Sequence, residues 1–189
     1  MSTGDFGDAK QCGMDFLSTR KFVRQTFGDQ ALRALGDKLA PQGYAGAVGD
    51  VILPDEWRPL IEYDALIGTV ELMFPQSARK LGRFQCQDQV RWWQRGAMRI
   101  LRPAWLIENA MALWGRYCTV GRWEVRWLRP TQATTIMHEM PMVSAAYCLT
   151  VSGFFERFLE LCGRREIRSL HTTCRQRGDA ECRHDVSWR

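Results

Sequence analysis

The residues best suited to chemistry lie in the C-terminal part of the chain, where a histidine and two cysteines surround a predicted turn. His171 precedes Cys174 by three residues, and Cys182 follows a Gly-Asp pair that is typical of a turn. Zinc prefers cysteine and histidine ligands, and Cys148, near the start of a predicted helix, can supply a fourth. Together the four residues would close a tetrahedral site, which is structural because no coordination position stays open for water.

The spacing alone leaves three interpretations of these residues open. No paired Cys-x2-Cys knuckle of the zinc-ribbon kind is present, so the cysteines can also be small side chains packed in a core. His171 can likewise be a hydrogen-bonded strand histidine. In a third interpretation, Cys174 and Cys182 form a redox-active pair.

The other titratable residues show no pattern of an enzyme. The chain has three histidines, His138, His171 and His184, and none stands in a catalytic triad, a Gly-x-Ser-x-Gly elbow or a His-Glu-x-x-His motif. Glu156 and Glu160 lie one helical turn apart, but on the face expected to meet solvent. We therefore expect a protein that is not an enzyme.

The composition is typical of a globular protein of the cytoplasm. The chain has 189 residues, of which 46% are hydrophobic and 25% charged, enough for one domain with its own core. No apolar run is long enough to span a bilayer, and residues 1–11 lack the shape of a signal peptide. The seven cysteines are scattered and odd in number, which fits a reducing compartment. The sequence predicts a cytoplasmic protein without a membrane span.

The charge pattern argues against nucleic acid as a direct partner. The net charge of +5 favours acidic partners, but the arginines are dispersed. The sequence has no Lys/Arg-rich arm, zinc-finger spacing or helix-turn-helix signature. The cysteines outside the candidate cluster are expected to be small buried side chains; they are Cys12, Cys86, Cys118 and Cys162.

The elements that must position these residues begin with helices. Periodic apolar residues predict helical segments at 16–27, 29–39, 62–74 and 77–84. Pro103 suits the first turn of a further helix. We expect residues 1–45 to form an N-terminal helical extension with a loose start, and residues 46–189 to form the main domain.

The second half of the chain predicts a sheet. From Trp123 to Trp127, apolar residues alternate with charged ones, as in a half-buried strand. The other predicted strands are 133–140, 166–174 and 181–188. Between the two hairpins lies the longest predicted helix, which Ser144 caps and Gly163 ends. The expected fold class is α+β: a four-stranded antiparallel sheet made of two hairpins, with the 144–162 helix covering one face.

Segments of this half also resemble a known family. They read CLTVSGFFERFLELCG at 148–163 and HTTCRQRGDAECRHDV at 171–186. The pattern is similar to the 4-vinyl-reductase-type domain, which shares a superfamily with haem-NO-binding-like sensors and with core subunits of the TRAPP vesicle-tethering complex. Upstream, LPDEWRP at 53–59 together with Tyr63 resembles the lead-in of a myxobacterial group of unknown function.

The resemblance implies a metal and a ligand. In the phenol-sensing regulators that carry this domain, a cysteine near the long helix, an acidic residue and two further cysteines bind zinc. The matching positions are Cys148, His171, Cys174 and Cys182, with histidine, itself a zinc ligand, at the acidic position. A strand tryptophan of those regulators takes part in binding an aromatic effector, and Trp127 matches it by position.

Together these features favour a signalling domain that senses a ligand. We expect a small apolar or aromatic molecule in an internal pocket lined by Trp105, Trp114, Trp127 and Phe154. Binding would be relayed to another protein, and the domain would form a homodimer. Structural Zn²⁺ is the expected cofactor. The alternative is a TRAPP-like dimeric scaffold or adaptor without a small ligand.

Overall fold

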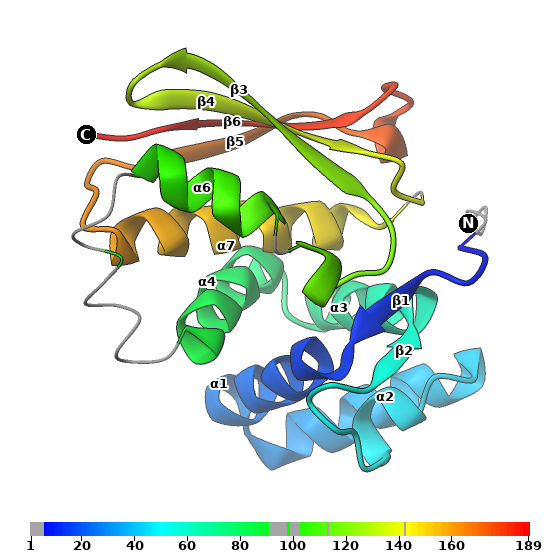
Figure 1. The fold of residues 1–189 in the computed structure, drawn as a ribbon. Helices are drawn as coiled ribbons and strands as arrows, with labels where there is room; N and C mark the ends of the chain where they lie inside the picture. Colours follow the sequence, from blue (N-terminus) through cyan, green and yellow to red (C-terminus); the bar gives the residue numbers. More distant parts are fainter. Residues whose placement is uncertain (1–5, 91–97, 99–102, 113, 142) are drawn as a thin grey trace.

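The chain folds into a sheet layer with helices packed beneath it (Figure 1). The computed structural model describes residues 6–90, 98, 103–112, 114–141 and 143–189. The helices are α1 (Gly13–Leu39), α2 (Gly46–Gly49), α3 (Leu60–Met73), α4 (Ser77–Gln89), α6 (Pro103–Ala112) and α7 (Ala145–Leu161). The strands are β1 (Lys10–Cys12), β2 (Trp57–Pro59), β3 (Arg122–Arg129), β4 (Gln132–His138), β5 (Arg168–Thr173) and β6 (Cys182–Ser187). None of the described helices combines the length and the apolarity needed to cross a bilayer.

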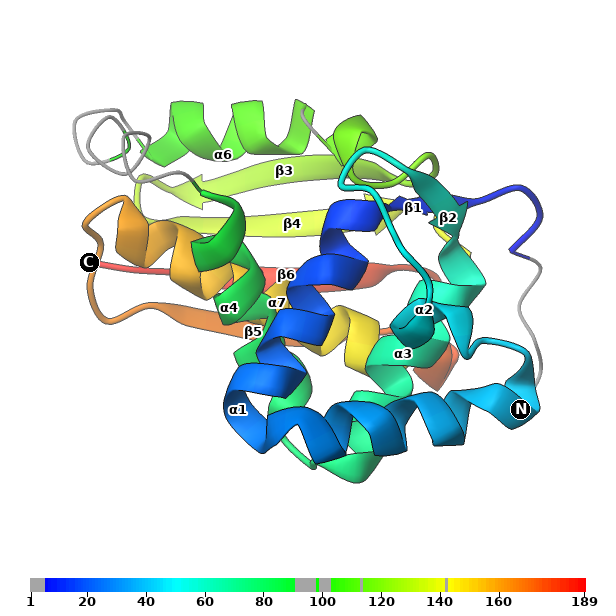
Figure 2. The same cartoon turned by 90° about the horizontal axis from the view of Figure 1, so that it is seen from below.

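The main sheet is four-stranded and antiparallel, in the order β3-β4-β6-β5. The two hairpins β3–β4 and β5–β6 are therefore joined through β4 and β6, and α7 covers one face (Figures 1 and 2). This confirms the predicted α+β fold. Side chains alternate between the two faces of a strand, so His184, which contacts Ser152 of α7, marks the covered face.

Helix α7 begins where the sequence predicts it. The Ser144 hydroxyl accepts a hydrogen bond from the Tyr147 N–H at 3.3 Å, and the carboxylate of Asp64 accepts from the Ser144 N–H and hydroxyl at 2.9 and 2.7 Å. The cap thus ties α7 to α3. Gly163, just after the helix, has a φ of 78°, the left-handed conformation that glycine adopts without strain.

One face of α7 differs from the prediction. Glu156 and Glu160 do not face solvent: their side chains are 13% and 31% exposed, and they pair with arginines of α4. Arg79 Nε donates to Glu156 Oε2 at 3.1 Å, and Arg83 NH2 donates to Glu160 Oε1 at 2.8 Å. The face looked solvated because the sequence gives no sign that α4 packs across it.

The N-terminal residues pack into the same core as the rest of the chain. Helix α1 spans both predicted segments and breaks at Gly28, whose φ is 88°. Its Phe16 and Val23 belong to one hydrophobic cluster with Leu66 of α3 and Cys148 of α7. Part of the expected loose start is ordered, because β1 pairs with β2 in a second, two-stranded sheet.

Candidate metal centre

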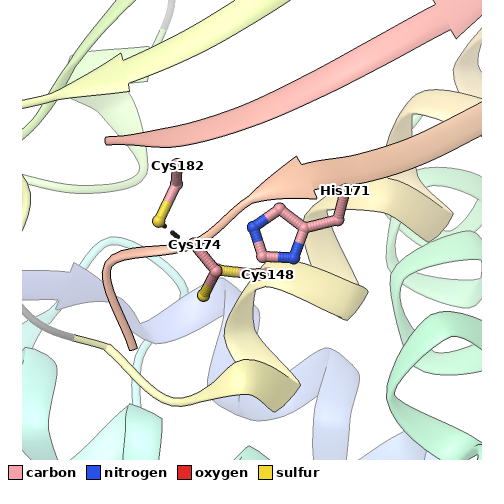
Figure 3. A group of neighbouring side chains, drawn as sticks. All are labelled: Cys148, His171, Cys174 and Cys182. Atoms are coloured by element: carbon pink, nitrogen blue, oxygen red, sulfur yellow. Dashed lines mark hydrogen bonds between the residues drawn. The ribbon is translucent and has the colours of Figure 1, made fainter. Parts of the chain in front are cut away.

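The four predicted metal ligands come together at one end of the main sheet. Cys148 stands in the first turn of α7, His171 on β5, Cys174 just beyond β5, and Cys182 at the start of β6. Their ligand atoms all lie within 4.8 Å of one another, and the Sγ atoms of Cys148 and Cys182 are 3.8 Å apart. Figure 3 shows the His171 ring directed toward the three sulfurs. The grouping brings together residues that are up to 34 positions apart in the sequence.

The turn between β5 and β6 holds Cys174 in place. The Cys174 N–H donates to the Asp179 carboxylate at 2.6 Å, and the Asp179 N–H donates to the Cys174 carbonyl at 3.2 Å. A short 3₁₀ turn, Arg175–Arg177, fills the space between them, and Gly178 closes it with a φ of 91°. A glycine is favoured there because other residues are strained at that φ.

The three cysteines of the cluster are buried, and His171 is half-buried. Cys148, Cys174 and Cys182 are 0%, 2% and 4% exposed. The Cys148 thiol donates toward Cys182, and this bond together with the nearby His171 lowers the pKa of Cys182, while the same bond and burial raise the pKa of Cys148. The buried Nε2 of His171 has no hydrogen-bond partner among the described residues. Three cysteine sulfurs and one imidazole nitrogen are a donor set that zinc takes in closed, structural sites.

A second histidine lies directly behind the cluster. The rings of His184 and His171 stack with centroids 4.7 Å apart and an angle of 17° between their planes. His184 is fully buried, and burial lowers its pKa to about 3. Its Nδ1 lies 3.0 Å from the Ser152 hydroxyl on α7. In the sequence, no pattern distinguishes His184 from the other two histidines. Its contact with His171 follows from the register in which β5 and β6 pair.

The structure does not bring the four predicted ligand-binding residues around one cavity. Trp105 is 52% exposed on α6, and Trp114 packs edge-on against Trp123 at 5.7 Å. Trp127 donates from Nε1 to Glu108 at 3.1 Å and belongs to a separate small cluster of apolar residues. Phe154 packs in a third cluster, beside Cys86 and Cys162. A shared role in binding one ligand remains a prediction for these residues.

A hollow of about 670 Å³ opens to solvent beside the metal-ligand turn. It is lined by residues 6–9, 119–120, 139–141 and Arg175. Arg175, next to Cys174, donates to the Met140 carbonyl across its edge. None of the predicted ligand-binding residues lines it.

A buried polar network in the helical layer escaped the sequence analysis. The Asp15 carboxylate accepts hydrogen bonds from the side-chain amides of Gln11 and, at 2.6 Å, of Gln89. Burial raises the pKa of Asp15 to about 6. The Tyr147 hydroxyl donates to Gln11 at 3.3 Å, so the network joins α1 to α7. Gln11 lies on β1 and Asp15 on α1, so no helical spacing in the sequence marks this contact.

Comparisons with known proteins place the fold. No family model matches the sequence, and no curated protein does either. Among solved structures, the H-NOX domain of Shewanella oneidensis in its Fe(II)CO ligation state is similar, with a TM-score of 0.64 and 13% identity over 94% of this chain and 98% of that one. An S. oneidensis H-NOX protein in the Fe(II)NO state gives 0.61 and 15% over 94% and 99%. Unliganded Fe(II) H-NOX protein from K. algicida gives 0.60 and 14% over 94% and 96%. At these identities the likeness shows the fold, which is H-NOX-like.

Proposed function

We propose that this chain is a non-enzymatic sensing domain with an H-NOX-like fold, in which Cys148, His171, Cys174 and Cys182 bind one structural zinc ion. The observation that carries the proposal is the grouping of three cysteine sulfurs and one imidazole nitrogen within 4.8 Å of one another. Three thiols and an imidazole satisfy zinc without an open position, so the ion would hold α7 to the β5–β6 hairpin and leave no place for a substrate.

The sensing role is supported by the fold. The H-NOX proteins that this chain resembles are described with NO or CO ligation, and the likeness extends over 94% of the chain and almost the whole of those proteins. We extend to this chain the general role of detecting a small molecule and passing the signal to another protein. The detected molecule is proposed to be small and apolar or aromatic, and the active form a homodimer in the cytoplasm.

The histidines of this chain do not fit the haem of those neighbours. One similar structure was solved to probe heme distortion in the H-NOX family, and others are described by the state of Fe(II). A haem is held by an axial side chain, in many sensors a histidine. Here His138 lies 2.8 Å from Glu124, and His171 and His184 stack on each other at 4.7 Å. All three stand on sheet strands, so we assign no haem ligand among the histidines and derive nothing through a haem.

The scaffold alternative finds less support. A helix-mediated dimer would present a continuous apolar helix face to its partner. Among the helix side chains whose exposure is described, the large exposed apolar ones are Leu72 and Trp105, and they stand on different helices, α3 and α6. The remaining ones stand on loops and strands.

The proposal is tested on protein purified without chelator. Elemental analysis should find about one zinc per chain in the wild type and in Cys162→Ser, and none in Cys174→Ser. Cys162 is the matched control, because it is a cysteine 1% exposed that lies outside the cluster. A wild-type protein without zinc and with all thiols reactive would overturn the metal centre.

The same sample tests the sensing role separately. Denaturing the protein should release a co-purifying apolar molecule that mass spectrometry detects. Alternatively, a screen of small aromatic compounds should find one that raises Tm. Zinc without any such ligand would leave the metal centre in place and remove the sensing role. A haem absorption band in the purified protein would show that the histidine argument is wrong.

A further inference from the structure

A row of polar side chains crosses the covered face of the sheet behind the candidate metal centre. In the strand register, Thr135 of β4 stands directly opposite His184 of β6, which stands opposite His171 of β5. Residues directly opposite each other share a face of the sheet, so all three point toward α7. Both Thr135 and His184 are buried, at 2% and 0% exposure. Polar groups in such a place require hydrogen-bond partners.

The partner of one His184 nitrogen determines the state of the other. The Ser152 hydroxyl lies 3.1 Å from the Cys148 carbonyl and 3.0 Å from His184 Nδ1. A hydroxyl has one proton, and a carbonyl can only accept, so both bonds form together only when Ser152 donates to Cys148 and accepts from Nδ1–H. The Nε2 atom of His184 then carries a lone pair rather than a proton.

Nε2 of His184 and two other buried polar atoms have no hydrogen-bond partner among the residues that the structure describes. They are Nε2 of His184, Oγ1 of Thr135 and Nε1 of Trp123. The first accepts, the second can donate or accept, and the indole N–H only donates. Leaving each of them unpaired in the interior would cost about 1–3 kcal/mol.

The strand register and one ring contact place the three groups next to one another. Thr135 is the direct neighbour of His184, and Trp123 lies diagonally from Thr135 on β3, with its ring centroid 6.0 Å from that of His184. Phe155 of α7 packs edge-on against Trp123 at 5.4 Å and forms an apolar wall. The surroundings are thus aromatic, with a small polar centre.

We propose that a single hydroxyl-bearing molecule binds between α7 and the sheet. Its oxygen accepts a hydrogen bond from the Trp123 indole N–H, and its O–H group donates one to Nε2 of His184. The Thr135 hydroxyl completes the contact as donor or acceptor. The ligand is either a water molecule or the hydroxyl of a small organic compound, since both offer this chemistry. This site lies behind the metal centre and shares no atom with it.

The position gives the site a route to the metal centre, a statement that rests on the proposed function. His184 stacks on His171, and Ser152 holds the carbonyl of Cys148. Both neighbours are proposed zinc ligands. A change in the hydroxyl site would therefore reach the zinc through two short contacts.

Nuclear magnetic resonance on ¹⁵N-labelled full-length protein tests the proposal. The Trp123 indole proton, assigned by its loss in Trp123→Phe, should show a rotating-frame cross-peak to water, which identifies water as the ligand. A cross-peak to carbon-bound protons that are not of the protein identifies an organic hydroxyl. An indole proton with cross-peaks to protein protons alone would overturn the proposal.

A pair of matched variants checks the geometry. Thr135→Val removes one partner of the molecule and should shift the His184 Nε2 resonance. Thr134→Val should leave that resonance unmoved, because Thr134 lies on the opposite face and bonds to Asp185 at 2.6 Å. Equal shifts in both variants would overturn the site. If Thr135→Val does not fold, the wild-type cross-peak decides. Zinc content measured on the same sample separates a failure here from a failure of the metal centre.

Discussion

Gly82 of α4 lies directly against the Thr150 carbonyl of α7: a Cβ added at Gly82 would stand 1.8 Å from that oxygen. The contact is reciprocal, since a Cβ at Gly153 of α7 would stand 1.9 Å from the Arg79 carbonyl of α4. The two backbones therefore touch where the helices cross. The arginine–glutamate pairs described above flank this crossing.

Gly82→Ala should destabilise the protein by about 2–3 kcal/mol and lower Tm by roughly 4–12 °C, because the new methyl group meets backbone that cannot move aside. The measurement is thermal or urea unfolding followed by circular dichroism. The control is Gly36→Ala in α1, where the nearest atom to an added Cβ is at 3.7 Å. There alanine should stabilise by up to about 1 kcal/mol through its helix propensity. Equal effects in the two variants would contradict the close crossing.

Asp15→Asn should change how stability depends on pH. Burial raises the pKa of Asp15 to about 6, so between roughly pH 4 and 6 the folded state holds a proton that the unfolded state has lost. The Asp15 contribution to stability therefore falls as pH rises through this window, by up to about 3 kcal/mol. Urea unfolding should show that the free energy of unfolding of the wild type falls between pH 4.5 and pH 7. The variant should lose less over the same interval. An unchanged difference between the two pH values would show that Asp15 titrates normally.

Removing the metal should loosen the attachment of the β5–β6 hairpin to α7. A chelator should lower the wild-type Tm by roughly 6–16 °C, which corresponds to about 3–4 kcal/mol, because an ion that binds only the folded state stabilises it by mass action. Cys182→Ser should start from a lower Tm and respond little to the same chelator. A wild-type Tm that the chelator leaves unchanged, in protein shown to contain zinc, would place the ion elsewhere.

Asp64→Ala should test the cap of α7. The substitution removes the acceptor of two hydrogen bonds from Ser144 and leaves its partly buried N–H without that partner, at a cost of about 1–3 kcal/mol. Ser144→Ala should cost about 1–2 kcal/mol, because it removes the N-cap together with the hydrogen bond that the Ser144 hydroxyl donates to Asp64. Asp37→Ala, at an exposed position of α1, should stay within about 0.5 kcal/mol of the wild type. If Asp37→Ala proves as damaging as Asp64→Ala, the contact with Ser144 is not what stabilises the helix.

The sequence was informative where local pattern determines structure. The alternation from Trp123 to Trp127 predicted β3, and Ser144 marked the start of α7 because a cap depends on neighbouring residues only. The four cluster residues were predicted from their types, their spacing and the family resemblance, and the packing of α7 on the β5–β6 hairpin brings them together. The metal itself stays a prediction.

The remaining features depend on contacts between distant segments. Strands β1 and β2 have three residues each, too few for a period to show. The burial of Glu156 follows from the crossing with α4, and the row from Thr135 to His171 follows from the register of three strands. Trp114 and Trp127 lie in different clusters. The sequence could not predict this, because an aromatic residue gives no sign of which partner it packs against.

The strand order has a consequence for the path of folding. β3–β4 and β5–β6 are local hairpins, but the sheet is complete only when β4 pairs with β6, and the whole of α7 lies between them in sequence. Closing that long loop costs more conformational entropy than closing either hairpin, so we expect each hairpin to form before the two meet. The candidate metal ligands span the same junction, with one on α7 and three in the second hairpin. A cation captured early would tether hairpin to helix and shorten the search for the final pairing, so the centre would act on the rate of folding as well as on its end point.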